Sequence, residues 1–162
     1  LLKDCDIPAH VESNTGYFSS YEIQVILSML RILDNPLQDI PMAAVLASPI
    51  VGMDDEELAQ IRSAFKGVSF AQAALSAMAG EDGYEDEKLK AFALVFERLR
   101  GAVADTPIHE LLYMMLDETG FYRYASAMPA GKRRRQNIDM LIEMAAAYEK
   151  TSYKGLFHFV RY

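Results

Sequence analysis

Residues 19–35 read SSYEIQVILSMLRILDN, and this stretch decides the fold of the chain. Its apolar residues recur at intervals of three and four, the spacing of one helix face: Ile23, Ile26, Leu27, Leu30 and Leu33. Val25 and Ile32 help to fill the opposite face. A helix that is apolar nearly all round is buried, so we expect this one at the centre of the domain. Ser19 and Glu22 have the spacing of a capping box, which predicts Ser19 as the N-cap.

Helix signals continue along most of the chain. Pro41 and Pro107 stand near predicted helix starts, which the fixed φ of proline favours, and Gly120 is placed to end a helix. Asp54 and Ser69 are predicted N-caps. The fold class is therefore all-α, a multi-helix domain of about seven to nine helices. The predicted segments cover residues 39–48, 54–65, 70–78, 86–104 and 108–119, a short helix or turn at 121–128, a long helix within 128–150 and a last helix from 152.

The two ends of the chain differ from its helical middle, because each reads as an interrupted element. Residues 1–11, LLKDCDIPAHV, read as the end of a helix, a turn at Asp6 and an extended stretch from Pro8 to Glu12. An isolated strand leaves its backbone groups unpaired, so a sheet elsewhere is implied. Residues 151–162 stop within an apolar helical pattern that has no terminator. We therefore expect the sequence to be a piece of a longer protein.

Composition limits the classes of function. With 162 residues, 51% of them hydrophobic, the chain suits one compact domain with a sizeable core. Its formal net charge of -7 argues against a protein whose whole surface binds nucleic acid, so any DNA contact must be local. The single cysteine, Cys5, excludes an internal disulfide and fits a reducing cytoplasm. No apolar run approaches the roughly 20 residues of a membrane span, so no membrane partner is expected.

Residues with catalytic potential are few and scattered. The sequence has no phosphate-binding G-x-x-x-x-G-K-[ST] loop, no G-x-G-x-x-G fingerprint and no H-E-x-x-H motif. His10, His109 and His158 fall in three different elements, so we interpret them as surface or packing residues. We expect no catalytic residue, no metal site and no cofactor site in this chain.

The stretch SPIVGMDDEELAQI at residues 48–61 predicts a hairpin that joins two helices and turns at Gly52. Such a hairpin can serve packing alone, or it can present backbone N–H groups to a phosphate, as helix starts do. The acidic residues that follow the turn match the positive end of the second helix dipole. The residues by themselves leave both interpretations open.

A run of four cations, Lys132, Arg133, Arg134 and Arg135, stands at the start of a long predicted helix. The helix dipole disfavours positive charge at that end, so helix stability does not explain the run. Two interpretations stay open: contact with an anionic partner such as phosphate, or salt bridges to carboxylates of this acidic domain. Successive helical positions differ by about 100°, so at most two of the four can face one partner.

Three segments together resemble a known family. They are DIPAHVES at residues 6–13, the stretch from YEIQVILSML to ELAQIR at 21–62, and the stretch from MPAGKRRR to FHFVR at 128–161. They are similar to the A subunit of bacterial ATP-dependent helicase/nucleases of the AddAB (RexAB) type, the counterpart of the RecB chain of exonuclease V among UvrD-like superfamily 1 helicases. The resemblance covers essentially the whole chain, and DNPLQDIPMAAVLASPIVG at 34–52 is its most specific part.

This resemblance implies a domain organisation. Residues 1–16 would be the end of a segment of the second motor domain, 2A, and 17–162 a single helical domain of the 2B type. In that family the glycine hairpin of 2B resembles a helix-hairpin-helix motif and touches the backbone of duplex DNA, which makes Gly52 and Met53 candidates for this contact. Asp54 stands where simpler helicases have a second glycine, and its carboxylate repels phosphate.

The resemblance also implies what the longer protein does. It would use ATP and Mg to move 3′ to 5′ on single-stranded DNA, unwind duplex and degrade strands in double-strand break repair and recombination. Its partners would be DNA and the second helicase/nuclease subunit, in the bacterial cytoplasm. This chain would be a non-catalytic helical domain that packs on the motor and guides duplex DNA, with Gly52, Met53 and Lys132 to Arg135 as backbone contacts. The alternative is a purely structural helical interaction module without DNA contact.

Overall fold

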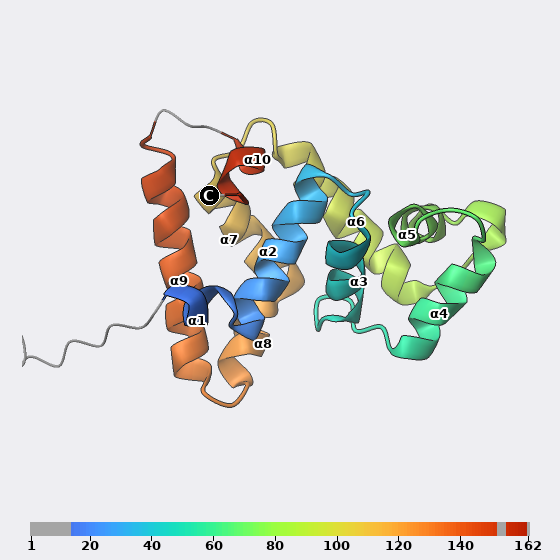
Figure 1. Ribbon diagram of the computed structural model, residues 1–162, viewed down its shortest axis with the longest axis horizontal. Helices are drawn as coiled ribbons and strands as arrows, with labels where there is room; N and C mark the ends of the chain where they lie inside the picture. Colours follow the sequence, from blue (N-terminus) through green and yellow to red (C-terminus); the bar gives the residue numbers. More distant parts are fainter. Residues whose placement is uncertain (1–13, 152–154, 162) are drawn as a thin grey trace, which may run out of the picture.

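The computed structural model describes residues 14–151 and 155–161, which form ten α-helices, one short 3₁₀ turn and no strand (Figure 1). The elements are α1 (Asn14–Phe18), α2 (Tyr21–Asp34), α3 (Asp39–Ala47), α4 (Asp55–Ala64), α5 (Phe70–Met78), η2 (Glu81–Gly83), α6 (Glu87–Ala102), α7 (Ile108–Thr119), α8 (Phe121–Ala127), α9 (Gly131–Tyr148) and α10 (Leu156–Phe159). α1 and α10 are single turns, and the other eight helices have seven residues or more. The predicted all-α fold is confirmed.

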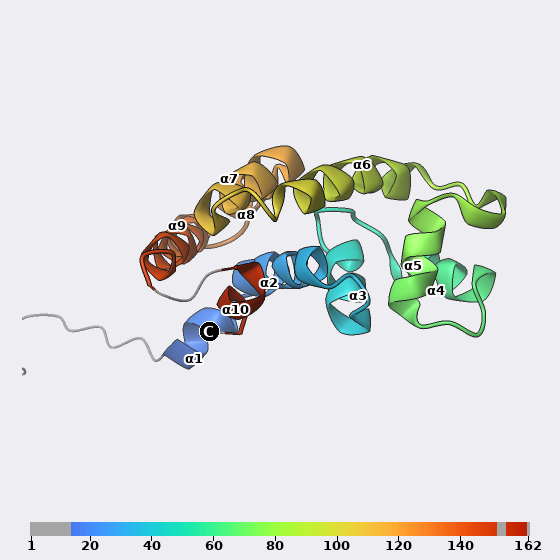
Figure 2. The same cartoon turned by 90° about the horizontal axis from the view of Figure 1, so that it is seen from above.

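α2 lies at the centre of the fold, where it packs against α1, α3, α6, α9 and α10. Ten of its 14 residues are buried, as the apolar pattern predicted. Figure 2 shows α6 and α7 in a layer above α2 and α3, while α4 and α5 gather at the end of the molecule opposite α9. Burying one Leu, Ile or Met side chain contributes about 1.5–3 kcal/mol. The apolar surface of α2 therefore holds together helices from both halves of the sequence.

Side-chain caps fix several helix starts. Asp54 and Glu57 form a capping box at α4, in which each backbone N–H donates to the carboxylate of the other residue over 2.8 Å. Ser69 begins α5 with a second capping box, and the side chain of Asp86 caps α6. Gly120 ends α7 in the left-handed conformation, with a φ of 66°. The caps predicted at Asp54 and Ser69 and the stop at Gly120 are confirmed.

The predicted capping box of Ser19 and Glu22 is wrong. The N-cap of α2 is Ser20, and no side-chain hydrogen bond caps this helix start. The hydroxyl of Ser19 donates to the carbonyl of Gly16 over 3.1 Å. The carboxylate of Glu22 contacts α9 instead, because donors on that helix satisfy its charge.

Glu22 is buried, with 1% of its surface exposed, and it joins α2 to the start of α9. Its Oε2 accepts from Arg134 Nη1 over 2.5 Å, and its Oε1 accepts from Asn137 Nδ2 over 2.6 Å. Tyr17 of α1 donates its hydroxyl to the carbonyl of Asn137 over 2.8 Å. Arg134 Nε also donates to the carbonyl of Pro129 over 3.0 Å. A buried carboxylate costs several kcal/mol unless it is paired, so this network fixes α1, α2 and α9 relative to one another.

The connection between α8 and α9 brings two backbones into contact at Gly131. A Cβ added to Gly131 would lie 1.9 Å from the carbonyl oxygen of Ser126, which is too close for any side chain. The preceding residue, Ala130, has a φ of 60°, a left-handed conformation that costs an L-residue roughly 1–2 kcal/mol. The start of α9 can therefore approach α8 only with glycine at position 131.

Predictions about the N-terminus fall largely on residues that the structure does not describe. The extended stretch from Pro8 to Glu12 lies outside the described residues, as do Cys5 and His10. α1 crosses the expected boundary between residues 16 and 17, and that boundary stays a prediction. Among the described helices, none is both long enough and apolar enough to cross a membrane.

Replacing Arg134 with methionine should lower the free energy of unfolding by about 3–5 kcal/mol, because Glu22 would stay buried without its cation. Replacing both Arg134 and Glu22 with methionine should cost clearly less, because no charge then remains buried. Urea denaturation followed by circular dichroism measures both variants. An Arg134→Met variant as stable as the unchanged chain would show that the pair does not hold α2 to α9.

Replacing Gly131 with alanine should destabilise the fold by about 1–3 kcal/mol, the range for forcing extra atoms into a packed site. Gly101 in α6 is the matched control, because a Cβ added there meets nothing within 4 Å. Alanine is favoured over glycine inside a helix by roughly 0.5–1 kcal/mol, so Gly101→Ala should stabilise the chain. Thermal melts of the two variants should shift in opposite directions, and a rise in melting temperature for Gly131→Ala would contradict the close approach of α8 and α9.

Candidate nucleic-acid interface

The turn between α3 and α4 uses its own N–H groups. Val51 and Gly52 both donate to the carbonyl of Ser48, over 3.1 and 2.7 Å, and Met53 donates to the carbonyl of Leu46 over 2.9 Å. The next residue, the N-cap of α4, uses its N–H in the capping box. The side chain of Met53 is buried, with 4% of its surface exposed. A phosphate could bind these N–H groups only by replacing an acceptor within the chain.

The charge around this turn is mainly negative. The first turn of α4 contains the carboxylates of Asp55, Glu56 and Glu57. Lys88 of α6 donates to the Glu57 carboxylate over 2.7 Å and to the carbonyl of Gly52 over 3.0 Å. The hydrogen bond with Lys88 lowers the pKa of the Glu57 carboxyl, and the same bond raises the pKa of the Lys88 ammonium group. One lysine thus stabilises the turn, but carboxylates still dominate its surroundings.

The four predicted cations lie in the first two turns of α9. Lys132, Arg133 and Arg135 are exposed. Arg134 is half-buried and forms the ion pair with Glu22. The internal salt bridge that the sequence left open is therefore confirmed for Arg134, and contact of the cluster with an anionic partner stays a prediction. We call Lys132, Arg133 and Arg135 the basic cluster.

Exposed aromatic side chains near the basic cluster escaped the sequence analysis. Tyr21, the first residue of α2, is 44% exposed, and Tyr124 of α8 is 48% exposed. Tyr21 and Arg133 line the same hollow, of about 330 Å³, between the starts of α2 and α9. Helical periodicity assigns such residues to solvent and says nothing of their neighbours. The tyrosines in FYRY, at residues 121–124, were the one sign available in the sequence.

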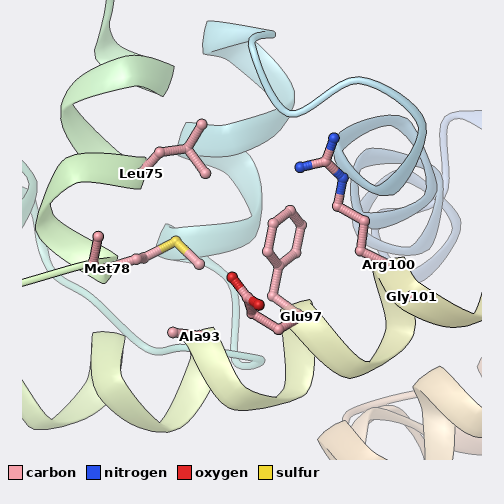
Figure 3. A pocket seen from close by; sticks show the side chains of 8 residues that line it. Leu75, Met78, Ala93, Glu97, Arg100 and Gly101 are labelled. Carbon is pink, nitrogen blue, oxygen red and sulfur yellow. The ribbon is translucent and has the colours of Figure 1, made fainter.

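A second hollow, of about 410 Å³, lies between α5 and α6 (Figure 3). Leu75 and Met78 of α5 lie across from Ala93 and Glu97 of α6 in this view. The described residues that line it include no histidine, cysteine, serine or threonine. This lining offers no pairing of a nucleophile with a base, so we do not place a catalytic site there.

His109 takes part in helix packing. It contacts the carboxylate of Glu149, which also accepts the N–H of Ile108 at the start of α7. Glu149, at the end of α9, thereby supplies the cap that Pro107 cannot give to α7. Within the part of the chain that the structure describes, no three His, Cys, Asp or Glu side chains are grouped to hold a metal ion.

Curated proteins include close relatives of this chain. It is 43% identical, over 159 residues and 97% of its length, to the ATP-dependent helicase/nuclease A subunit of Anoxybacillus flavithermus. Identity is 41% to the protein of that name from Bacillus cytotoxicus and 39% to the one from Bacillus velezensis, each over 99% of this chain.

The matched region is a small part of each relative. The chain spans 13% of the length of these three proteins. No protein-family model matches the chain. The alignments nevertheless extend over nearly all of its residues, at 39–43% identity. The chain therefore belongs to the family of the ATP-dependent helicase/nuclease A subunit.

Proposed function

We propose that this chain is a non-catalytic helical segment of an ATP-dependent helicase/nuclease and that it guides duplex DNA by holding the phosphate backbone. The basic cluster makes the contact. One observation carries the proposal: three of the four cations in the first turns of α9 are exposed on a chain whose net charge is -7, and two of them can face one DNA backbone at a time. An acidic protein repels DNA over most of its surface, so a local group of cations directs where DNA can approach.

Arg134 has a different role from the other three cations of this run. Its guanidinium neutralises the buried Glu22 carboxylate, and this pair holds the start of α9 in place. The basic cluster then projects from a fixed helix end, and the first turn of α9 contains no acidic residue that would compete with phosphate. Contacts of this kind position DNA without reading its sequence.

The hairpin residues Gly52 and Met53 stay a second, weaker candidate for backbone contact. Their N–H groups donate to acceptors within the chain, and the nearby carboxylates repel phosphate. The basic cluster instead brings three exposed cations to one helix start whose first turn contains no acidic residue, so we assign it the main contact.

We also propose that the helicase and nuclease activities for which the relatives are named reside in other parts of the longer protein. In double-strand break repair and recombination, the longer protein would hydrolyse ATP with Mg, translocate 3′ to 5′, unwind duplex and degrade strands. It would also pair with the second helicase/nuclease subunit. The present chain has no phosphate-binding loop motif. We expect the chain to pack on the motor and to position the DNA, without taking part in ATP hydrolysis or strand cleavage.

A purely structural helical module without DNA contact is the second candidate. Internal use of cations favours it: Arg134 pairs with Glu22, and Arg98 pairs with Glu118 over 3.2 Å. If the basic cluster is occupied by carboxylates in the same way, it is not available for phosphate.

Replacing Lys132, Arg133 and Arg135 with glutamine should weaken binding of the chain to blunt duplex DNA. It should also reduce the slope of log affinity against log salt by up to about 0.9 for each phosphate that the variant no longer neutralises, since fewer counterions are released. Sequence preference should not change, because no base contact is removed. Fluorescence anisotropy with a labelled duplex at several salt concentrations measures affinity and slope together.

The control removes the same charge elsewhere. Lys66, Arg100 and Lys150 are exposed and lie outside α8 and outside the first turns of α9, so their replacement with glutamine changes the net charge equally. This control should keep nearly the affinity and slope of the unchanged chain. Equal effects of the two triple variants would reject the local phosphate contact and favour the structural module.

A further inference from the structure

Two exposed tyrosines beside the basic cluster contribute little to the core of the fold. Tyr21 and Tyr124 leave nearly half of their surfaces exposed, and neither ring belongs to the buried core. The ring of Tyr124 stacks beside Phe121 at a centroid distance of 6.3 Å, which covers one of its two faces at most. Large aromatic side chains usually contribute most when buried, so two of them left at one exposed corner point to a role in binding.

The two rings lie at one corner of the molecule. Tyr21 begins α2, and Tyr124 lies on α8, which packs against α9. Burial raises the pKa of the Tyr21 hydroxyl most, and Tyr124 and Arg134 exert smaller electrostatic effects on it, so both lie within electrostatic range of Tyr21. Figure 1 shows the start of α2 and the α8 helix together at the end of the molecule where α9 begins.

A hollow of about 330 Å³ lies beside one of these rings, and one cation of the basic cluster contributes to its lining. Tyr21 and Arg133 both line it, together with Ser20 and Asn137. Its inner side contains the Glu22 carboxylate, but the hydrogen bonds from Arg134 and Asn137 satisfy that charge. The hollow is therefore lined by an aromatic side chain, a cation and a compensated ion pair.

Aromatic faces and cations together suit unpaired nucleotides better than closed duplex. Bases in a duplex stack on one another and offer only their edges, so a tyrosine face cannot stack on them. An unpaired base offers its face, and its phosphate can meet a neighbouring cation. From this geometry we infer that Tyr21 and Tyr124, beside the basic cluster, form a stacking site for unpaired nucleotides at a DNA end or fork. The inference deepens the proposed function and rests on it.

The test compares three labelled probes: a single-stranded oligothymidine, a blunt duplex, and the same duplex with an oligothymidine overhang. Replacing Tyr21 and Tyr124 together with leucine removes the rings but keeps their apolar bulk. We expect binding of this variant to the single strand and the overhang to weaken at least about fivefold, the lower end of the loss for one stacked base. Blunt-duplex affinity and the salt slope should stay unchanged, because no charge is lost.

Two controls keep the result interpretable. Replacing both tyrosines with phenylalanine retains the rings and should retain single-strand affinity. Phe157 on α10 is 43% exposed and lines a hollow at the opposite end of α2, with Arg31 and Asp34. Phe157→Leu should therefore leave binding of all three probes unchanged. Circular dichroism of each variant verifies that the helices are intact.

The outcomes separate the inference from the function on which it rests. If the glutamine variant of the basic cluster loses affinity but the leucine variant does not, the stacking site is wrong and the phosphate contact stands. If the leucine variant weakens duplex and single strand equally, the site is also wrong, because stacking cannot act on closed duplex. If the unchanged chain binds no probe at low salt, both proposals fail.

Discussion

The salt bridge between Glu22 and Arg134 is the interaction on which the arrangement of this molecule depends. A buried carboxylate demands compensation, and the structure gives it two donors from the first turns of α9. This demand fixes the rotation of α9 about its own axis. Because successive side chains on a helix differ by about 100°, an inward Arg134 directs its neighbours Arg133 and Arg135 away from the core. The internal pair thus decides which cations the surface can offer.

Most of the fold could be predicted from the sequence because its helices carry local signals. Apolar spacing placed the buried α2, and short-range chemistry placed the starts at Asp54 and Ser69 and the stop at Gly120. The start of α2 was missed because Ser19 and Glu22 have the spacing of a capping box, while the real partner of Glu22 lies 112 residues away. No local pattern records a contact of that separation. The tight backbone approach at Gly131 was missed for a different reason: it joins residues only five positions apart, but it depends on how α8 and α9 pack.

The candidate site could be predicted only in part. The run of four cations is visible in the sequence, but their division into one internal and three exposed residues is a property of the fold. For the hairpin, the sequence was misleading. Its glycine suggested free N–H groups, but the structure shows the N–H groups of Gly52 and Met53 donating to acceptors within the chain. Tyr21 and Tyr124 belong to different helices, so their closeness follows from how those helices pack and leaves no trace in the residue order.

The sequence separation of Glu22 and Arg134 also has a consequence for how the chain is made. A ribosome adds roughly 5–20 residues each second, so Glu22 leaves the synthesis machinery several seconds before Arg134 exists. During that interval α2 is apolar on nearly all sides, and its carboxylate has neither Arg134 nor Asn137 as a partner. The face of α2 that packs on α9 therefore stays uncovered until α9 arrives, and until then it is open to chaperones or to neighbouring chains.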